Sequence, residues 1–141
     1  MTDYKAVFFD TAPLIYYLDD HPEYKGAVIG FIGNTKNSKY VTSTITTMEY
    51  LTGAFRSGTP EKEADYDNFL SAMDITIIDG GEDDIVRKAA HLRAEYKIKG
   101  MDALQLASAI ESGCDLFFTN DNRLKQVSEI TVLTVDEIGK Q

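Results

Sequence analysis

Four acidic side chains stand directly beside apolar segments: Asp10 ends "AVFF", Glu49 lies in "TTMEYL", Asp102 opens "DALQLASAI" and Asp121 follows "LFFTN". An isolated buried carboxylate is costly to ionise, so it normally needs pairing, hydrogen bonds or a metal ion. Four carboxylates in one place would repel one another unless cations bind or some of them stay protonated. Mg²⁺ suits such a cluster, because it is a hard cation that prefers oxygen ligands and keeps several of its waters.

Each of these acids also has a purely structural interpretation. Asp10 is suited to capping a helix that begins near residue 12, and Asp102 to capping or opening its own helix. Glu49, taken alone, is typical of a solvated helix face, and Asp121 is typical of a turn before "NRLKQV". The metal-site hypothesis therefore depends on the combination of the four acids, and on whether the fold brings them together.

Short β-branched or aromatic runs alternate along the chain with longer amphipathic runs. The short runs predict strands at 5–9, 39–42, 74–78, 115–119 and 130–134. Such alternation predicts an α/β fold with a central, mostly parallel sheet of about five strands and helices on both faces. Ligands in such folds bind beyond the carboxyl ends of the strands. Asp10 and the segment Thr119-Asn120-Asp121 are therefore expected at the functional edge.

The longer runs predict helices between the strands. Residues 82–98 place an apolar stripe on one face: Ile85, Ala89, Leu92 and Tyr96. Residues 102–112 predict a further helix, which Gly113 would end as its C′ residue. Two prolines suit first helical turns: Pro13, and Pro60 after a Thr59 cap. In "GAVIGFIG" the spacing of Gly26, Gly30 and Gly33 excludes a dinucleotide fingerprint and favours close helix packing or a broken helix.

Composition narrows the class of protein. The 141 residues favour one domain, 1–141, and 43% hydrophobic with 26% charged residues is typical of a globular chain. The single cysteine, Cys114, excludes an internal disulfide and fits a reducing, cytoplasmic location. The start lacks the pattern of a signal peptide, and no run approaches the roughly 18 apolar residues of a membrane span. The net charge of −9 argues against purely electrostatic nucleic-acid binding, unless cations neutralise some acids or a basic partner covers them.

Four segments, in order and over nearly the whole chain, carry a family resemblance: "FFDTAPLIYYLD", "TTMEYL", "KGMDALQLASAIESGCD" and "LFFTNDNRL". With them the sequence resembles the PIN-domain ribonucleases, in particular the VapC-type toxins of prokaryotic toxin–antitoxin systems. The resemblance assigns Asp10, Glu49, Asp102 and Asp121 to the family's acidic metal-binding positions. It also matches three polar positions beside them: Thr11, Thr119 and Asn120.

What the resemblance implies is metal-dependent endonucleolytic cleavage of RNA, with Mg²⁺ as the cofactor and Mn²⁺ as a substitute. Asp10 and Asp121 are expected to be the closest ligands. Asp102 and Glu49 would bind directly or through water, and either is placed to take a proton. Whether one ion or two bind stays open. A metal-bound water is easier to deprotonate, and the cation offsets charge on the phosphate oxygens.

RNA also needs cationic contacts, and Lys99 and Arg123 are nearest to the acids in sequence. Further basic residues flank them, and each also fits a solvated face: Arg93, Lys97 and Lys125. The resemblance further implies a cognate antitoxin and a homodimer. Apolar residues near the N-terminal helices could form the dimer surface or simply fill the core: Tyr16, Tyr17, Leu18, Ile29, Phe31, Ile32 and Phe55.

Three other functions share features with this sequence. A phosphatase with an aspartyl-phosphate intermediate would carry a second Asp two residues after Asp10, where this chain has Ala12, so that mechanism is disfavoured. A catalytically weak PIN-like binding or scaffold protein would share the fold but lack metal-dependent cleavage. An RNA-processing nuclease without an antitoxin would share the chemistry, and an antitoxin reading frame beside the gene would separate it from a toxin.

Overall fold

The structure is a computed structural model that describes residues 3–139. Five strands form one sheet: β1 (Ala6–Phe9), β2 (Lys39–Ser43), β3 (Ile75–Ile78), β4 (Leu116–Thr119) and β5 (Thr131–Thr134). Their order in the sheet is β3-β2-β1-β4-β5, and every neighbouring pair is parallel. The α/β prediction is confirmed, each predicted strand boundary lies within one residue of the observed one, and the sheet is wholly rather than mostly parallel.

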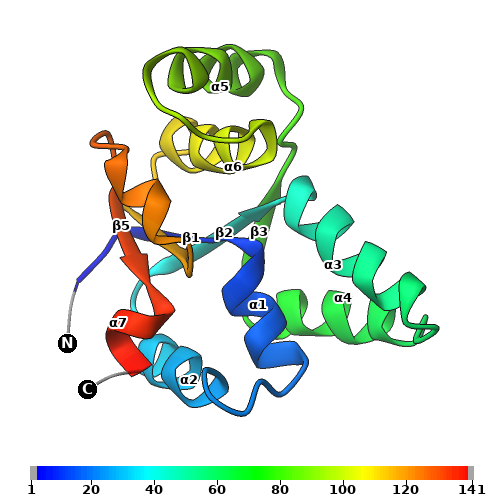
Figure 1. Ribbon diagram of the computed structural model, residues 1–141. Helices are drawn as coiled ribbons and strands as arrows, with labels where there is room; N and C mark the ends of the chain where they lie inside the picture. Colours follow the sequence, from blue (N-terminus) through cyan, green and yellow to red (C-terminus); the bar gives the residue numbers. More distant parts are fainter. Residues whose placement is uncertain (1–2, 140–141) are drawn as a thin grey trace.

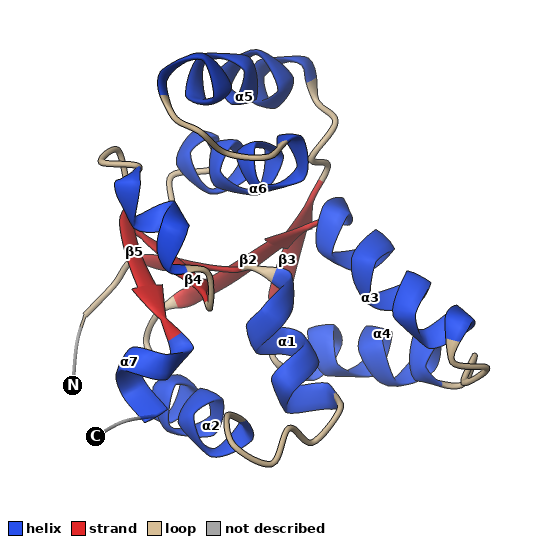
Figure 2. Ribbon diagram, in the orientation of Figure 1, coloured by secondary structure: helices blue, strands red, loops and turns tan. Residues whose placement is uncertain are grey.

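Helices cover both faces of the sheet (Figures 1 and 2). They are α1 (Thr11–Leu18), α2 (Lys25–Asn34), α3 (Thr44–Arg56), α4 (Lys62–Ala72), α5 (Asp83–Glu95), α6 (Gly100–Glu111), α7 (Val135–Gly139) and the 3₁₀ helix η1 (Asn122–Gln126). The pair α5 and α6 lies on one face, and α1, α2 and α7 lie on the other (Figure 1). The pair α3 and α4 connects β2 to β3 at the side of the molecule and packs on the α1 side.

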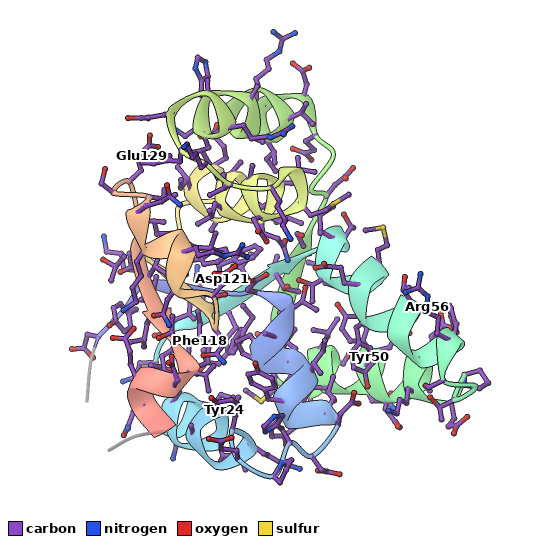
Figure 3. The ribbon with its side chains drawn as sticks, in the orientation of Figure 1. Tyr24, Tyr50, Arg56, Phe118, Asp121 and Glu129 are labelled. Atoms are coloured by element: carbon purple, nitrogen blue, oxygen red, sulfur yellow. The ribbon has the colours of Figure 1, made fainter. Side chains whose placement is uncertain are left out.

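Two hydrophobic clusters fill the space between these layers. Val7, Phe9 and Phe118 face α1 and α2, while Phe8 and Phe117 face α5 and α6. Phe118 is labelled on the α1 side of the sheet in Figure 3. Because both faces are covered, every second side chain of a strand still enters a core. This explains why "AVFF" and "LFF" are continuous apolar runs rather than alternating ones.

The strand order reverses between β1 and β4, at the centre of the sheet. From β1 the chain leaves into α1 on one face, and it reaches β4 from α6 on the other face. A crevice at the carboxyl ends of the strands is expected at such a switch point. The backbone N–H of Asp10 donates to the carbonyl of Phe118 at 2.9 Å, so the end of β1 is fixed against β4.

Three predicted helix boundaries are wrong by a few residues. The helix predicted at 82–98 ends at Glu95, because the backbone of Tyr96 is extended (φ −119°, ψ 155°), and the next helix begins early, at Gly100. Helix α4 begins at Lys62, so Pro60 lies in the preceding turn and Thr59 is not the cap. Gly113 ends α6 as predicted, and its φ of +82° is the left-handed conformation that glycine tolerates best.

The two predictions for the glycines of α2, close helix packing and a broken helix, are both wrong. The helix is continuous through Gly26, Gly30 and Gly33, and a Cβ at any of the three would meet nothing within 4 Å.

Of the residues expected to offer apolar surface, Phe31 is buried and stacks on Phe118. Pro13 lies in the first turn of α1, as predicted. Within residues 3–139, no helix combines the length and hydropathy needed to span a membrane.

Candidate active site

Asp10 lies where β1 ends and α1 begins, and three neighbours hold its carboxylate. It is the N-cap of α1, with Oδ1 accepting from the backbone N–H of Thr11 at 2.9 Å. The hydroxyl of Thr119, at the end of β4, donates to Oδ2 at 2.8 Å. The side-chain amide of Gln105 on α6 approaches Oδ1 at 3.3 Å. The cap interpretation and the site interpretation are therefore compatible, because one oxygen caps the helix while the other is held by β4.

Burial raises the pKa of Asp10 to about 6, even though the hydrogen bonds from Thr119 and Thr11 act in the opposite direction. The negative charges of Asp102 and Glu49 raise it further. The charged form of a carboxyl whose pKa is raised this far is unfavourable in the folded protein unless a cation binds to it. Raised pKa values of this kind are typical of functional sites.

Glu49 and Asp102 face Asp10 from two helices. Glu49 lies on the exposed face of α3, and its Oε1 accepts from the hydroxyl of Thr11 at 2.6 Å. Asp102 lies in the first turn of α6 and is not its N-cap, which is Lys99. Burial raises the pKa of Asp102, and the charges of Asp121 and Glu49 add to this, while Arg123 and Lys99 oppose it. The electrostatic contacts thus link all four acids in one place.

Asp121 differs from the other acids because it already has a cation. It caps η1, with Oδ1 accepting from the backbone N–H of Arg123 at 3.0 Å. The Arg123 guanidinium also donates through Nε to Oδ1 at 2.9 Å and through Nη2 to Oδ2 at 2.6 Å. These bonds lower the pKa of Asp121. In Figure 3 the Asp121 side chain lies below α6 and near the start of α1.

The donor set suits a hard divalent cation, because four carboxylates, two at strand ends and two on helices, interact electrostatically with one another. Among residues 3–139, however, no three acidic, histidine or cysteine side chains lie close enough to hold a metal ion as they stand. The Arg123 guanidinium occupies both oxygens of Asp121, so this carboxylate would have to exchange partners. The assignment of the four acids as ligands stays a prediction.

Comparison with known proteins supplies the family. The model of the PIN domain matches residues 7–130 of the sequence. The chain belongs to the PIN domain family. None of the curated protein sequences compared with it matches.

Solved structures agree with this PIN fold. A chain of VapBC2 from Rickettsia felis, bound to a DNA fragment from its promoter, is 22% identical with a TM-score of 0.73, over 92% of this chain and 98% of that one. A toxin–antitoxin complex from Klebsiella pneumoniae is 25% identical with a TM-score of 0.69, over 92% and 97%. VapBC-1 from nontypeable Haemophilus influenzae is 17% identical with a TM-score of 0.73, over 93% and 98%. The resemblance to the VapC type is therefore confirmed at the level of the fold.

Two supporting residues of this PIN domain have different roles. Thr119 donates to Asp10, so it touches the acidic cluster. Asn120 faces the other way: its amide donates to the hydroxyl of Tyr16 at 3.0 Å, and its oxygen accepts from the backbone N–H of Asp136 at 3.1 Å. Asn120 therefore fastens the loop after β4 to α1 and to α7, and acts on Asp121 only by positioning that loop.

A buried polar network behind Asp10 was missed in the sequence. Gln105 is 1% exposed; its amide donates to the hydroxyl of Thr46 at 2.7 Å, and its oxygen accepts from Ser43. The network joins α6 to the end of β2 and the start of α3. The sequence did contain a signal, because Gln105 interrupts the apolar face of "DALQLASAI" three residues after Asp102, on the same side of the helix.

Two hollows adjoin the acids. The apolar hollow, about 820 Å³, reaches from Glu49 and Asp121 across a face of α5 and α6 formed by Val86, Ala89, Ala90, Met101 and Leu104. The basic hollow, about 500 Å³, is lined by Arg93, Tyr96, Lys97, Lys99, Asp102 and Arg123. Three of these basic residues, Arg93, Lys99 and Arg123, also line the apolar hollow. RNA binding by Lys99 and Arg123 stays a prediction. Lys125 lies elsewhere, because it pairs with Glu137.

Proposed function

We propose that this protein is a metal-dependent endoribonuclease and the toxin of a toxin–antitoxin pair. The observation that carries the proposal is the arrangement of Asp10, Glu49, Asp102 and Asp121 at the switch point of a PIN-domain sheet. The raised pKa values of Asp10 and Asp102 support it, because burial, and to a lesser extent the neighbouring acids, disfavours their charged forms, and a bound cation relieves both effects.

Asp10 and Asp121 would hold the metal most directly, with Asp102 and Glu49 completing the set. Bound Mg²⁺, or Mn²⁺ in its place, would ease deprotonation of water and offset charge on the scissile phosphate. Thr119 and Gln105 fix the orientation of the Asp10 carboxylate through their hydrogen bonds. Thr11 does the same for Glu49, which is the acid most exposed to solvent and therefore suited to carrying a proton away.

An antitoxin is the proposed protein partner. The VapBC neighbours are complexes of this kind, and they support the assignment without identifying the partner of this chain. The apolar hollow adds a second support, because acidic side chains adjoin its apolar wall: Glu49, Asp102 and Asp121. Three basic side chains also line it: Arg93, Lys99 and Arg123. A basic amphipathic segment would bury its apolar face there and place a cation among the acids.

The remaining assignments follow from the same function. We expect one domain over residues 1–141, acting in the cytoplasm as a homodimer. Ile29 and Phe55 are 50% and 53% exposed and support a dimer surface. The mass in solution at micromolar concentration is the direct measurement, and a monomeric mass would exclude the dimer.

The nuclease proposal is tested by incubating the purified protein with structured RNAs in Mg²⁺, Mn²⁺ or chelator. We expect cleavage that needs the metal and that is abolished in Asp10→Ala and in Asp121→Asn. The matched control is Asp115→Asn, which also removes one negative charge. Asp115 lies before β4 at the opposite edge of the sheet, where it accepts from the backbone N–H groups of Lys5 and Ala6.

The purified sample must first be shown by mass spectrometry to contain this chain alone, because a copurified antitoxin would inhibit it. Metal-dependent cleavage that survives in both Asp10→Ala and Asp121→Asn would refute the assignment of the acids. Absence of any metal-dependent cleavage by the pure wild type, on every RNA tested, would favour a binding or scaffold role instead.

A further inference from the structure

The sheet ends at β3, and the outer edge of this strand has no strand beside it within residues 3–139. On its inner side β3 pairs with β2 over Ile75–Ile78. Apart from that pairing, no hydrogen bond in the described part of the chain reaches the backbone of residues 75–78. Backbone groups alternate in direction along a strand, so about half of those in β3 face away from β2. Such an edge is a template for a further strand.

The middle of β3 is exposed on both faces of the sheet. The side chains of Thr76 and Ile77 point to opposite faces, and both are exposed, Ile77 by 45%. In the inner strand β1, by contrast, Phe8 and Phe9 are fully buried. Proteins commonly protect a sheet edge with charged residues or proline within the strand. The sequence of β3, "ITII", contains neither, so only its shortness protects it.

A hollow adjoins each side of this edge. The hollow on the α4 side, about 260 Å³, is lined by Leu70 and Ile75, which belong to the hydrophobic cluster on the α1 face of the sheet. The other hollow, about 340 Å³, is lined by Ile78 and Ile85, which pack in the cluster beneath α5 and α6. Ile77 lines both. The two hollows therefore lie on opposite faces of the sheet, one on each side of the exposed edge.

Both hollows are acidic. No basic residue lines either of them, whereas six acids do: Asp67, Asp74, Asp79, Glu82, Asp84 and Glu111. None of the six belongs to an ion pair within residues 3–139. The two hollows at the active site share no lining residue with them. Asp74 also lines a neighbouring hollow with Lys36 and Lys39, so the negative charge is concentrated toward the carboxyl end of β3.

Local structure explains only part of this charge. Glu82 and Asp84 lie at the N-terminal end of α5, where the helix dipole favours acids, and Asp79 accepts a backbone N–H within its own turn. Glu111, however, is the last residue of α6, and Asp74 directly follows the C-cap of α4. Negative charge is unfavourable at the C-terminal end of a helix. Helix stability therefore does not explain these two acids.

We propose that the outer edge of β3 binds an extended, basic segment of a partner protein, which adds to the sheet as one more strand. Backbone hydrogen bonds to β3 hold the segment, and its consecutive side chains enter the two hollows in turn. Two adjacent basic residues would thus place one cation beside Asp67 and the next beside Glu111, while an apolar neighbour contacts Ile77. This interaction is separate from the proposed nuclease function and does not depend on it.

The experiment follows the backbone amides of the ¹⁵N-labelled, full-length protein by NMR during titration with a synthetic peptide. The peptide has a central pair of lysines, flanked on each side by valine and threonine. A second peptide has the same side chains but a methyl group on every backbone nitrogen, so that it keeps the charge and cannot donate to a strand. We expect the first peptide to shift the amides of residues 75–78 and to bind about tenfold more tightly than the second.

Ile77→Lys tests whether the strand edge is the contact. It replaces an apolar cross-strand contact with a like charge and should weaken binding of the first peptide about tenfold. Met48→Lys is the matched control, because Met48 is 47% exposed on α3 and lines neither hollow. Its affinity should stay within about twofold of wild type. Thermal melts establish that both variants are folded.

A pair of double variants tests the charge of the hollows. Asp67→Asn with Glu111→Gln removes one acid from each hollow and should weaken binding about fivefold. Asp65→Asn with Glu95→Gln removes the same charge from exposed positions of α4 and α5 outside both hollows. The second double variant should bind within about twofold of wild type, because net charge alone does not hold the peptide.

Several results would overturn the proposal. Equal affinity for the methylated peptide would mean that charge alone attracts the segment. Shifts centred on Asp10 and Asp121 would mean that the peptide binds the active-site acids instead. Absence of any shift at about 1 mM peptide would exclude the interaction. If Ile77→Lys lowers the mass of the protein in solution and Met48→Lys does not, the edge is covered by a second copy of this chain rather than by a partner.

Discussion

Asp10→Asn should stabilise the protein when no metal is present. Burial raises the pKa of Asp10 from 3.8 to about 6, so the folded state binds this proton more tightly than the unfolded chain does. The stability that Asp10 contributes when protonated is lost as the pH rises from about 4 to about 6, and it stays lost above that range. A difference of about two pKa units corresponds to about 3 kcal/mol at pH 7.

The asparagine removes the charge but also one acceptor. Its amide nitrogen cannot accept from Thr119, or alternatively from Thr11 and Gln105, and this loss costs about 1 kcal/mol. The net gain at pH 7 is then about 2 kcal/mol. With an unfolding entropy of about 2.1 cal/mol/K per residue, that gain raises the Tm of a chain of 141 residues by roughly 7 °C.

The assay is thermal and urea unfolding of wild type and Asp10→Asn in EDTA, from pH 5 to pH 8. The advantage of the variant should shrink by about 1 kcal/mol between pH 7 and pH 5, because wild-type Asp10 is then largely protonated. Added Mn²⁺ should reverse the order, since the wild type binds it more tightly.

Asp115→Asn provides a control of opposite sign. Burial acts to raise the pKa of Asp115, but the backbone amides of Ala6 and Lys5 outweigh it and lower that pKa. The stability from Asp115 is thus present throughout pH 5 to 8, and its asparagine variant should be less stable by an amount that does not change over this range. An Asp10→Asn effect that is equally independent of pH would refute the reasoning about burial.

Three further outcomes are expected. Arg123→Gln should bind Mn²⁺ several-fold more tightly in calorimetry, because Asp121 no longer has a competing cation. The same variant should cleave RNA more slowly. Unchanged Mn²⁺ affinity would mean that the Asp121–Arg123 pair does not compete with the metal. The Mn²⁺ affinity of wild type should rise between pH 5 and 7 and level off above, because Asp10 must release its proton; a flat profile would contradict this. Gln105→Leu should lower the free energy of unfolding by about 1–3 kcal/mol, since Ser43 and Thr46 lose buried partners, and urea unfolding at pH 7 measures it.

The fold could be predicted from the sequence because each strand is recognisable from its own short segment. A strand buried on both faces must be apolar at nearly every position, so "AVFF" and "LFF" could be recognised without knowing their neighbours. The acids Asp10 and Asp121 could be placed because the carboxyl ends of parallel strands share one edge. The same logic does not extend to Glu49 and Asp102, whose positions in helices fitted a structural role equally well.

What could not be predicted depends on contacts between distant segments. The role of Gln105 appears only when α6 packs against β2 and α3, because its partners are more than 50 residues away in sequence. The early end of α5 creates the extended segment at Tyr96 that borders the basic hollow, and nothing in the apolar stripe indicated it. The different contacts of Thr119 and Asn120 also depend on where β4 ends: Thr119 is the last residue of the strand and donates to Asp10, whereas Asn120, in the bend that follows, donates to Tyr16.

The two strand-end acids are in opposite electrostatic states, and this asymmetry follows from the topology. Asp10 is enclosed by α1, β4 and α6, so only neutral donors reach it and its pKa rises. Asp121 opens η1 at the surface, where the following turn returns Arg123 to it and its pKa falls. A divalent cation would therefore act differently on the two acids. At Asp10 it would offset the charge that burial disfavours, whereas at Asp121 it would have to compete with the guanidinium of Arg123.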